Sequence, residues 1–221
     1  MSRSVAPPKA KVFPLAPRHP WLRAVMQSCP VILAINWCFQ GTRGMDRGER
    51  AFRLALEAAL ALLLTPFAGW LAALVIAHSF NFLFNGQLWV CARYCPAWRR
   101  SPRALDRFLA ETAAELRRIP WLEEAVCIGS RAAGSDVPGP NSDIDLRLVR
   151  PPGLRRWLAI NLLLLRLRTR ALFRLVPLDL YAYDDLASLD RFRRDEPLLV
   201  ILDRAGRIAR RYAERPRTSL P

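Results

Sequence analysis

Two hydrophobic patterns divide the chain. Towards the C-terminus, apolar residues either recur at helical spacing or alternate with polar residues, as they do in half-buried strands. The stretch 58–92, by contrast, contains no Asp, Glu, Lys or Arg. Between the two patterns lies a segment with Pro96 and Pro102, where we place the boundary between an apolar helical region (29–95) and a C-terminal domain (101–221).

The C-terminal domain is expected to be a small mixed β-sheet with flanking helices, an α+β or α/β fold. Apolar residues at every third or fourth position predict a helix from Pro102 to Arg118, and Pro120 disfavours its continuation. The same reasoning predicts strands at 125–128, 143–149, 176–181 and 197–202, and helices at 154–173, 184–194 and 207–212. Strands and helices in this order favour a mixed sheet.

The uncharged stretch 58–92 is long enough for a bilayer-spanning helix of ~20 residues. Pro66 and Gly69 should interrupt or kink such a helix, and arginines flank both of its ends. A broken helical hairpin therefore fits better than a single crossing. Two interpretations of the hairpin stay open, namely association with a membrane and packing as a soluble helical core or a homo-oligomer interface.

Two further features belong to the apolar region. His78, Asn81 and Asn85 share one helical face, so they either hold a buried helix pair together, which we favour, or bind an acceptor or a lipid headgroup. The apolar run 30–39 is too short to span a bilayer. It predicts either a buried strand or a further part of the same apolar assembly.

Composition narrows the class of protein. A hydrophobic share of 52% excludes a disordered chain, and a net charge of +15 favours polyanionic partners such as nucleotides, nucleic acid or anionic lipids. The Pro-rich, basic segment 1–28 lacks the apolar core of a secretory signal and is expected to be extended. Five cysteines without a small-scaffold spacing favour reduced thiols. We therefore expect a cytoplasmic protein, at the cytoplasmic face of the membrane if the hairpin binds one.

The strongest candidate for a functional site lies in the C-terminal domain. A Gly-Ser-Arg-Ala-Ala-Gly sequence at 129–134 is typical of a phosphate-binding turn, and a Ser-Asp-Ile-Asp-Leu sequence at 142–146 begins the next strand. Because side chains alternate along a strand, Asp143 and Asp145 point to the same face and can bind one hard cation together. Asp179, on a later expected strand, supplies a third carboxylate.

This set of residues suits the chemistry of a triphosphate. Carboxylates alone would repel a polyanion, whereas carboxylates that hold Mg²⁺ can meet the charge that develops on phosphate oxygens during transfer. An ordinary turn followed by a capping aspartate is the alternative interpretation. The three elements together, in this order, favour the functional one.

On these motifs the region from about residue 101 to the C-terminus resembles a minimal nucleotidyltransferase of the DNA polymerase beta superfamily, whose pattern is a Gly-Ser turn, an Asp-x-Asp strand and a later single Asp. The resemblance implies a nucleotidyltransferase fold and two Mg²⁺ ions, with Mn²⁺ as a substitute. Its implied catalytic and metal-binding residues are Asp143, Asp145 and Asp179. Its implied nucleotide-binding residues are Gly129, Ser130, Arg131 and Ser142. The loop 135–141 is longer than is usual in that family.

The expected function is therefore Mg²⁺-dependent transfer of NMP, with ATP as the expected donor, to a hydroxyl or phosphate acceptor that the sequence does not identify. The alternative is a non-catalytic adaptor, membrane-associated or antitoxin-like, that uses the same fold to bind a protein. Nucleic-acid binding ranks last, because it rests on the basic charge alone.

Overall fold

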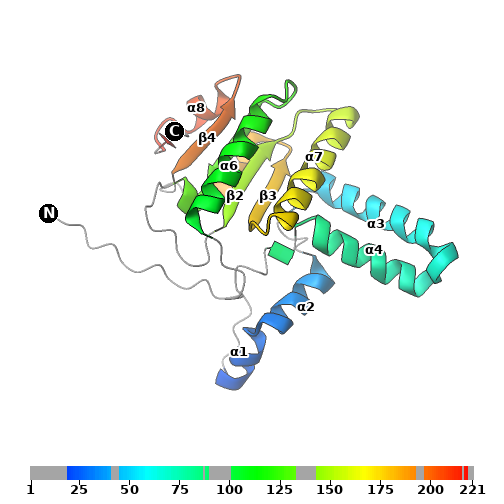
Figure 1. Ribbon diagram of the computed structural model, residues 1–221. Helices are drawn as coiled ribbons and strands as arrows, with labels where there is room; N and C mark the ends of the chain where they lie inside the picture. The colour runs from blue at the N-terminus through cyan, green and yellow to red at the C-terminus, as the bar shows by residue number, and fades with distance from the viewer. Residues whose placement is uncertain are drawn as a thin grey trace.

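The computed structural model describes residues 19–40, 45–86, 88–89, 101–132, 143–192, 197–215 and 217–218. The proposed boundary near 96–100, most of the N-terminal segment and Ser142 lie outside the described residues. The described part is a mixed α/β domain with two pairs of helices that precede it (Figure 1). The expected mixed sheet with flanking helices is confirmed.

Five strands form one mixed sheet in the order β3-β2-β1-β4-β5. Their bounds are β1 Glu124–Ile128, β2 Ile144–Val149, β3 Leu178–Tyr183, β4 Leu198–Asp203 and β5 Arg217–Thr218. Strand β1 is antiparallel to both β2 and β4, whereas β2 and β3 are parallel, as are β4 and β5. The third expected strand is displaced by two residues and the fourth by one, and the first two differ by one residue at one end.

Two long helices, α6 (Pro102–Arg117) and α7 (Leu154–Phe173), pack on one face of the sheet (Figure 1). Alternate side chains of the strands, such as Cys127, Leu146 and Leu180, point into the apolar core between the sheet and these helices. The opposite face carries Val126 and Tyr183, which pack against the 3₁₀ helix η4 (Leu186–Arg191) and the short helix α8 (Arg207–Arg211). The helix expected at 184–194 is therefore a shorter 3₁₀ turn.

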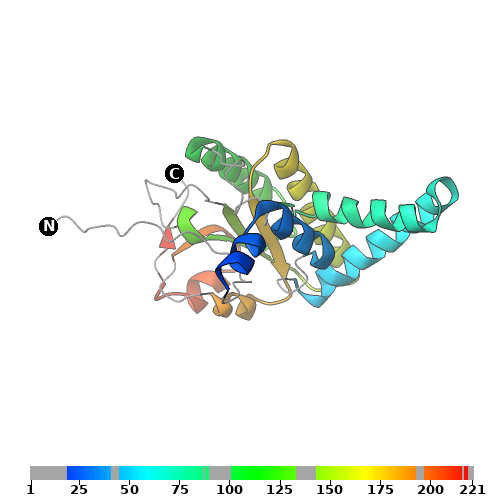
Figure 2. The same cartoon turned by 90° about the horizontal axis from the view of Figure 1, so that it is seen from below.

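A helical hairpin projects from the domain, as Figures 1 and 2 show from two directions. Its helices are α3 (Arg47–Ala68) and α4 (Trp70–Phe84), which pack against each other along their lengths. Asp46 caps α3, since its Oδ1 accepts a hydrogen bond of 2.6 Å from the Glu49 N–H. Pro66 lies within α3, so the expected interruption there is wrong. The break falls at Gly69 alone, whose φ of +74° suits a residue without a Cβ.

Two short helices, α1 (Pro20–Met26) and α2 (Cys29–Phe39), precede the hairpin. The extended conformation expected for the N-terminal segment is wrong for α1, because proline is well suited to the first turn of a helix. The strand alternative for 30–39 is likewise wrong: α2 packs against α4, and the Trp37 indole donates a hydrogen bond of 3.1 Å to Ser79 Oγ.

The polar residues of α4 hold the helix pair together, as favoured from the sequence. His78 Nδ1 lies 2.9 Å from Glu57 Oε1 on α3. The Asn81 amide donates to Glu57 Oε2 at 2.9 Å and to the Arg53 carbonyl at 3.0 Å, and the Asn85 amide donates to Asn81 Oδ1 at 2.6 Å. These polar groups face each other across the base of the hairpin.

The expectation of reduced thiols is wrong for Cys29. Cys29 is disulfide-bonded, whereas Cys38 and Cys127 are free among the described residues. Spacing along the chain does not reveal such a pairing, because a disulfide depends on distances that only the folded chain sets.

Candidate functional site at one end of the sheet

The three sequence motifs meet at one end of the sheet. The last residue of β1, Ile128, pairs with Asp145 near the start of β2. Across the parallel pair of strands, Asp145 is in turn level with Asp179 of β3. Asp143 directly precedes β2 and is 5% exposed. The fold thus brings together residues that are up to about fifty positions apart in the sequence.

A residue that sequence reasoning missed, Arg147, stands between two of these carboxylates. Its Nη2 lies 2.9 Å from Asp179 Oδ2 and 3.4 Å from Asp145 Oδ1. Its Nη1 donates a hydrogen bond of 2.6 Å to the Asp179 carbonyl. The guanidinium also packs against the rings of Tyr181 and Phe192. The alternation along the strand could have indicated Arg147, because position 147 follows Asp143 and Asp145 at the same spacing of two residues.

The closeness of these charged groups shifts the pKa values of Asp145 and Arg147. Burial raises the pKa of Asp145 well above its ordinary value, and the neighbouring Asp143 and Asp179 carboxylates raise it further, against the lowering effect of Arg147. Burial lowers the pKa of Arg147, but Asp179 and Asp145 outweigh this and raise it above its ordinary value. With all three carboxylates ionised, they and the guanidinium carry a net charge of −2. A divalent cation would balance this charge and favour the ionised form of Asp145.

The type and number of donors decide whether Mg²⁺ suits the site. Mg²⁺ prefers hard oxygen ligands and is usually held by one or two carboxylates together with substrate phosphates. Asp145 and Asp179 form such a pair. Within the described ranges, no three His, Cys, Asp or Glu side chains stand in an arrangement that could hold a metal ion. The carboxylate pair therefore fits Mg²⁺ when substrate oxygens complete the coordination, and Arg147 competes with the cation for the same oxygens.

The turn after β1 supplies donors rather than acceptors. It begins at Gly129 with φ of +79° and continues as the 3₁₀ helix η3 (Gly129–Arg131), with Ser130 at its centre. Arg131 Nη1 is 2.6 Å from Asp106 Oδ1 on α6, while its Nε and Nη2 are buried and have no hydrogen-bond partner in the described part of the chain. Buried donors without acceptors are costly, so an anion at this turn would be favourable.

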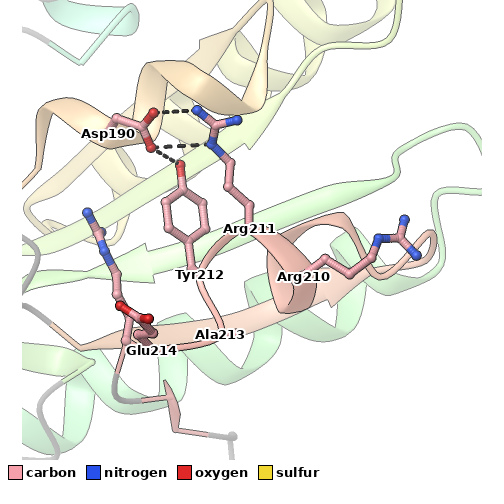
Figure 3. A pocket seen from close by; sticks show the side chains of 7 residues that line it. Asp190, Arg210, Arg211, Tyr212, Ala213 and Glu214 are labelled. Atoms are coloured by element: carbon pink, nitrogen blue, oxygen red, sulfur yellow. Dashed lines mark hydrogen bonds and ion pairs between the residues drawn. The ribbon is translucent and has the colours of Figure 1, made fainter.

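A hollow of about 580 Å³ lies near the site and was not predicted from the sequence. In Figure 3, Arg211 and the Tyr212 hydroxyl both point toward Asp190, whereas Arg210 points away from it. Arg215 also lines the hollow and donates a hydrogen bond of 3.0 Å to the carbonyl of Phe192. The Phe192 ring packs against Arg147, so Phe192 connects the lining of the hollow to the carboxylate site.

Two kinds of side chain near the site lie inside the protein. Aromatic residues on a strand could stack on a base, but Tyr181 and Tyr183 are 8% and 2% exposed and pack on the face of the sheet that carries Val126. Arginines on a long helix usually form a solvated face. Arg168 of α7 is instead buried and ion-paired with Glu49 of α3 at 2.8 Å. The helix period gave no warning of a charged partner far away in the sequence.

Comparison with protein-family models, with curated proteins and with solved structures finds no match to this chain. The assignment of a function therefore rests on the residues and their geometry.

Proposed function

We propose that this protein is a Mg²⁺-dependent nucleotidyltransferase that transfers NMP, with ATP as the expected donor, to a hydroxyl or phosphate acceptor. One observation carries the proposal: Asp145 and Asp179 lie level on the parallel strands β2 and β3, next to the end of β1 where the Gly129 turn begins. Buried like charges are unfavourable in the free protein, so they are expected where a cationic ligand is to bind.

Each residue has a role in this proposal. Asp145 and Asp179 would hold Mg²⁺ together with phosphate oxygens, and the Asp143 carboxylate, which acts on Asp145 electrostatically, would add to the negative charge that attracts the ion. Bound Mg²⁺ would supply charge neutralisation and polarise the phosphate oxygens. The backbone N–H groups of the turn at Gly129 and Ser130 would receive the triphosphate. The buried Nε and Nη2 atoms of Arg131 would donate to its oxygens.

Arg147 is a positioning residue in the same proposal. It holds the Asp179 carboxylate through Nη2 and the Asp179 carbonyl through Nη1, at 2.9 and 2.6 Å. Side chain and backbone of Asp179 are therefore fixed by one buried guanidinium. Without nucleotide, this cation also limits the repulsion between Asp145 and Asp179.

The reaction itself balances without further reactants. The acceptor oxygen forms a bond to the α-phosphorus, and the bond from that phosphorus to the oxygen bridging to the β-phosphate breaks, which releases pyrophosphate. For a hydroxyl acceptor, Asp179 would accept the proton. The positioning of donor and acceptor in line supplies much of the rate enhancement.

Calorimetric titration with α,β-methylene ATP tests the proposal, because this analogue cannot be cleaved at the α-phosphorus. We expect binding that requires Mg²⁺ and is lost in Asp143→Ala/Asp145→Ala. Asp184→Asn is the matched control, since Asp184 lies just past the opposite end of β3 and pairs with Arg150. Absence of binding by the wild type with any NTP would contradict the proposal and favour the adaptor alternative.

A further inference from the structure

We infer that the α3–α4 hairpin inserts its end into one leaflet of a lipid bilayer. The inserted part, here called the hairpin tip, comprises residues 58–77. Its large side chains are exposed to a degree that is rare for apolar residues in water: Leu62 is 75% exposed, Phe67 85%, and Trp70 71%. The inference is independent of the proposed catalytic activity.

The exposure surrounds the hairpin tip rather than marking one side of it. Every residue from 65 to 72 is exposed, and so are the three consecutive residues 74–76. Successive helical residues point about 100° apart, so three in a row cover more than half of the circumference. On α4 only the small Ala73 and Ala77 are fully buried in this stretch, where they face α3. A protein partner covers one face, whereas lipid surrounds a hairpin that is apolar on all sides.

The length of the hairpin tip matches the thickness of one leaflet rather than that of the whole bilayer. Arg47–Ala68 is the one described helix that, by length and composition, could cross a bilayer unaided, while α1 and α2 reach that length only as a pair bent by 63°. The first half of α3, however, contains Glu49 and Arg53, which are buried against the domain. The uncharged part, 58–68, has eleven residues and spans about 16 Å, roughly half of the ~30 Å hydrocarbon core.

The base of the hairpin fixes where the membrane surface would lie. Glu57 and His78 form an ion pair or hydrogen bond at 2.9 Å where the uncharged stretch begins, and exposed Arg47 and Arg50 follow on the side of the domain. Glu49 joins the hairpin to α7 through Arg168. Basic side chains at this level complement anionic headgroups, in keeping with the net charge of +15.

Flotation with vesicles of phosphatidylcholine and phosphatidylglycerol tests insertion by the full chain. Wild-type protein is expected to float with the vesicles, and Phe67→Asp/Trp70→Asp to bind at least about tenfold less, because two anchoring side chains are lost and two charges are added. The control Leu154→Asp/Leu158→Asp adds the same charges to exposed leucines on α7 and should bind like the wild type. Circular dichroism melts verify that all variants fold.

Either of two flotation results would overturn the inference: the wild type does not float, or it floats equally well after the substitutions in the hairpin tip. A wild type that does not float but forms a lipid-free oligomer, which Phe67→Asp/Trp70→Asp converts to monomers, would assign the apolar surface to a second copy of this chain.

Insertion depth is measured by tryptophan quenching in bilayers brominated at defined positions on the acyl chains. Because the chain has seven tryptophans, the signal of interest is the difference between wild type and Trp70→Phe. A hairpin tip in one leaflet predicts that bromines near the chain ends quench this difference most. Strongest quenching by bromines near the headgroups would contradict it, since a surface-bound or a fully spanning hairpin places Trp70 there.

Discussion

The two ends of this molecule depart from the usual distribution of residues in opposite ways. At one end of the sheet, the charged residues Asp143 and Arg147 are each 5% exposed. At the end of the hairpin, Phe67 and Trp70 are 85% and 71% exposed. Proteins normally expose charged residues and bury large apolar ones. Each departure costs free energy in the isolated chain, and a different kind of ligand would relieve each one.

The comparison teaches that the type of departure indicates the type of ligand. Buried like charges are relieved by a cation and by an anionic substrate that the cation neutralises. Exposed apolar side chains are relieved by an apolar environment. The two regions are joined through Glu49, whose carboxylate binds Arg53 and Arg168 at 2.7 and 2.8 Å. Arg168 in turn donates to the carbonyl of Leu180, next to Asp179.

The largest effect is expected at this joint. Glu49→Ala removes the carboxylate shared by two buried arginines and leaves both charges without it, so the free energy of unfolding should fall by about 3–5 kcal/mol. Urea denaturation measures the loss. Glu123→Ala is the control, because Glu123 and Arg207 are both about half exposed, and such a pair contributes at most about 1 kcal/mol. Equal losses in the two variants would contradict the role given to Glu49.

A smaller effect is expected for Asp145→Asn, which should lower activity without lowering stability. Asp145→Asn should reduce label transfer from α-labelled ATP to acceptors in a cell lysate by at least about a hundredfold, as expected for lost metal ligation. The folded protein should keep its melting temperature within a few degrees, because the substitution removes one of three crowded carboxylates and leaves Arg147 paired with Asp179. Full activity of the variant would refute the proposed role.

Arg131, which supplies hydrogen-bond donors to the site, predicts a smaller effect that is specific to nucleotide binding. Arg131→Gln removes the buried Nε and Nη2 donors that have no partner in the described part of the chain. Loss of a charge-assisted hydrogen bond should raise the Kd for nucleotide about tenfold or more. Arg118→Gln, at an exposed position at the end of α6, should leave the Kd unchanged. The same Kd for both variants would remove Arg131 from the site.

The smallest effect is on the pH dependence of stability at Asp190, which lines the hollow near the site. Hydrogen bonds from Arg211 and Tyr212 lower the pKa of Asp190 to about 2. Stability from this group is therefore present above its unfolded pKa of about 3.9 and is lost as the pH falls toward 2. Unfolding measured between pH 5 and pH 2.5 should show a shallower pH dependence for Asp190→Asn. The difference should stay below about 1 kcal/mol, because the pair is exposed. Identical pH profiles would contradict this assignment.

The sequence predicted most of the elements and singled out Asp145 and Asp179, which the fold brings level on neighbouring strands, because both depend on local periodicity. Alternation placed Asp143 and Asp145 on one face, and the helix predicted at 154–173 has the bounds of α7. Partners that are distant in the sequence were not predictable. Nothing near Arg168 indicates Glu49, and nothing near Arg147 shows that Asp179 is its neighbour, because both pairs depend on how β3 and α3 pack.

The hairpin, too, was predictable from the sequence only in part. Its existence followed from the uncharged stretch and the glycine, whereas the continuation of α3 through Pro66 did not follow from local preference. A proline in the last turn removes only one hydrogen bond, since the helix ends two residues later. Whether apolar residues face a protein core or remain exposed depends on the neighbouring elements, and the sequence alone left both interpretations of the hairpin open.

Electron paramagnetic resonance of Mn²⁺ tests the central claim most directly, because Mn²⁺ stands in for Mg²⁺ and its free signal disappears on binding. Titrating Mn²⁺ into the protein with α,β-methylene ATP should show saturable binding beyond that of the nucleotide alone, and Asp145→Asn/Asp179→Asn should abolish this excess. Unchanged Mn²⁺ binding in the double variant, or none in the wild type, would contradict a cation site at this end of the sheet.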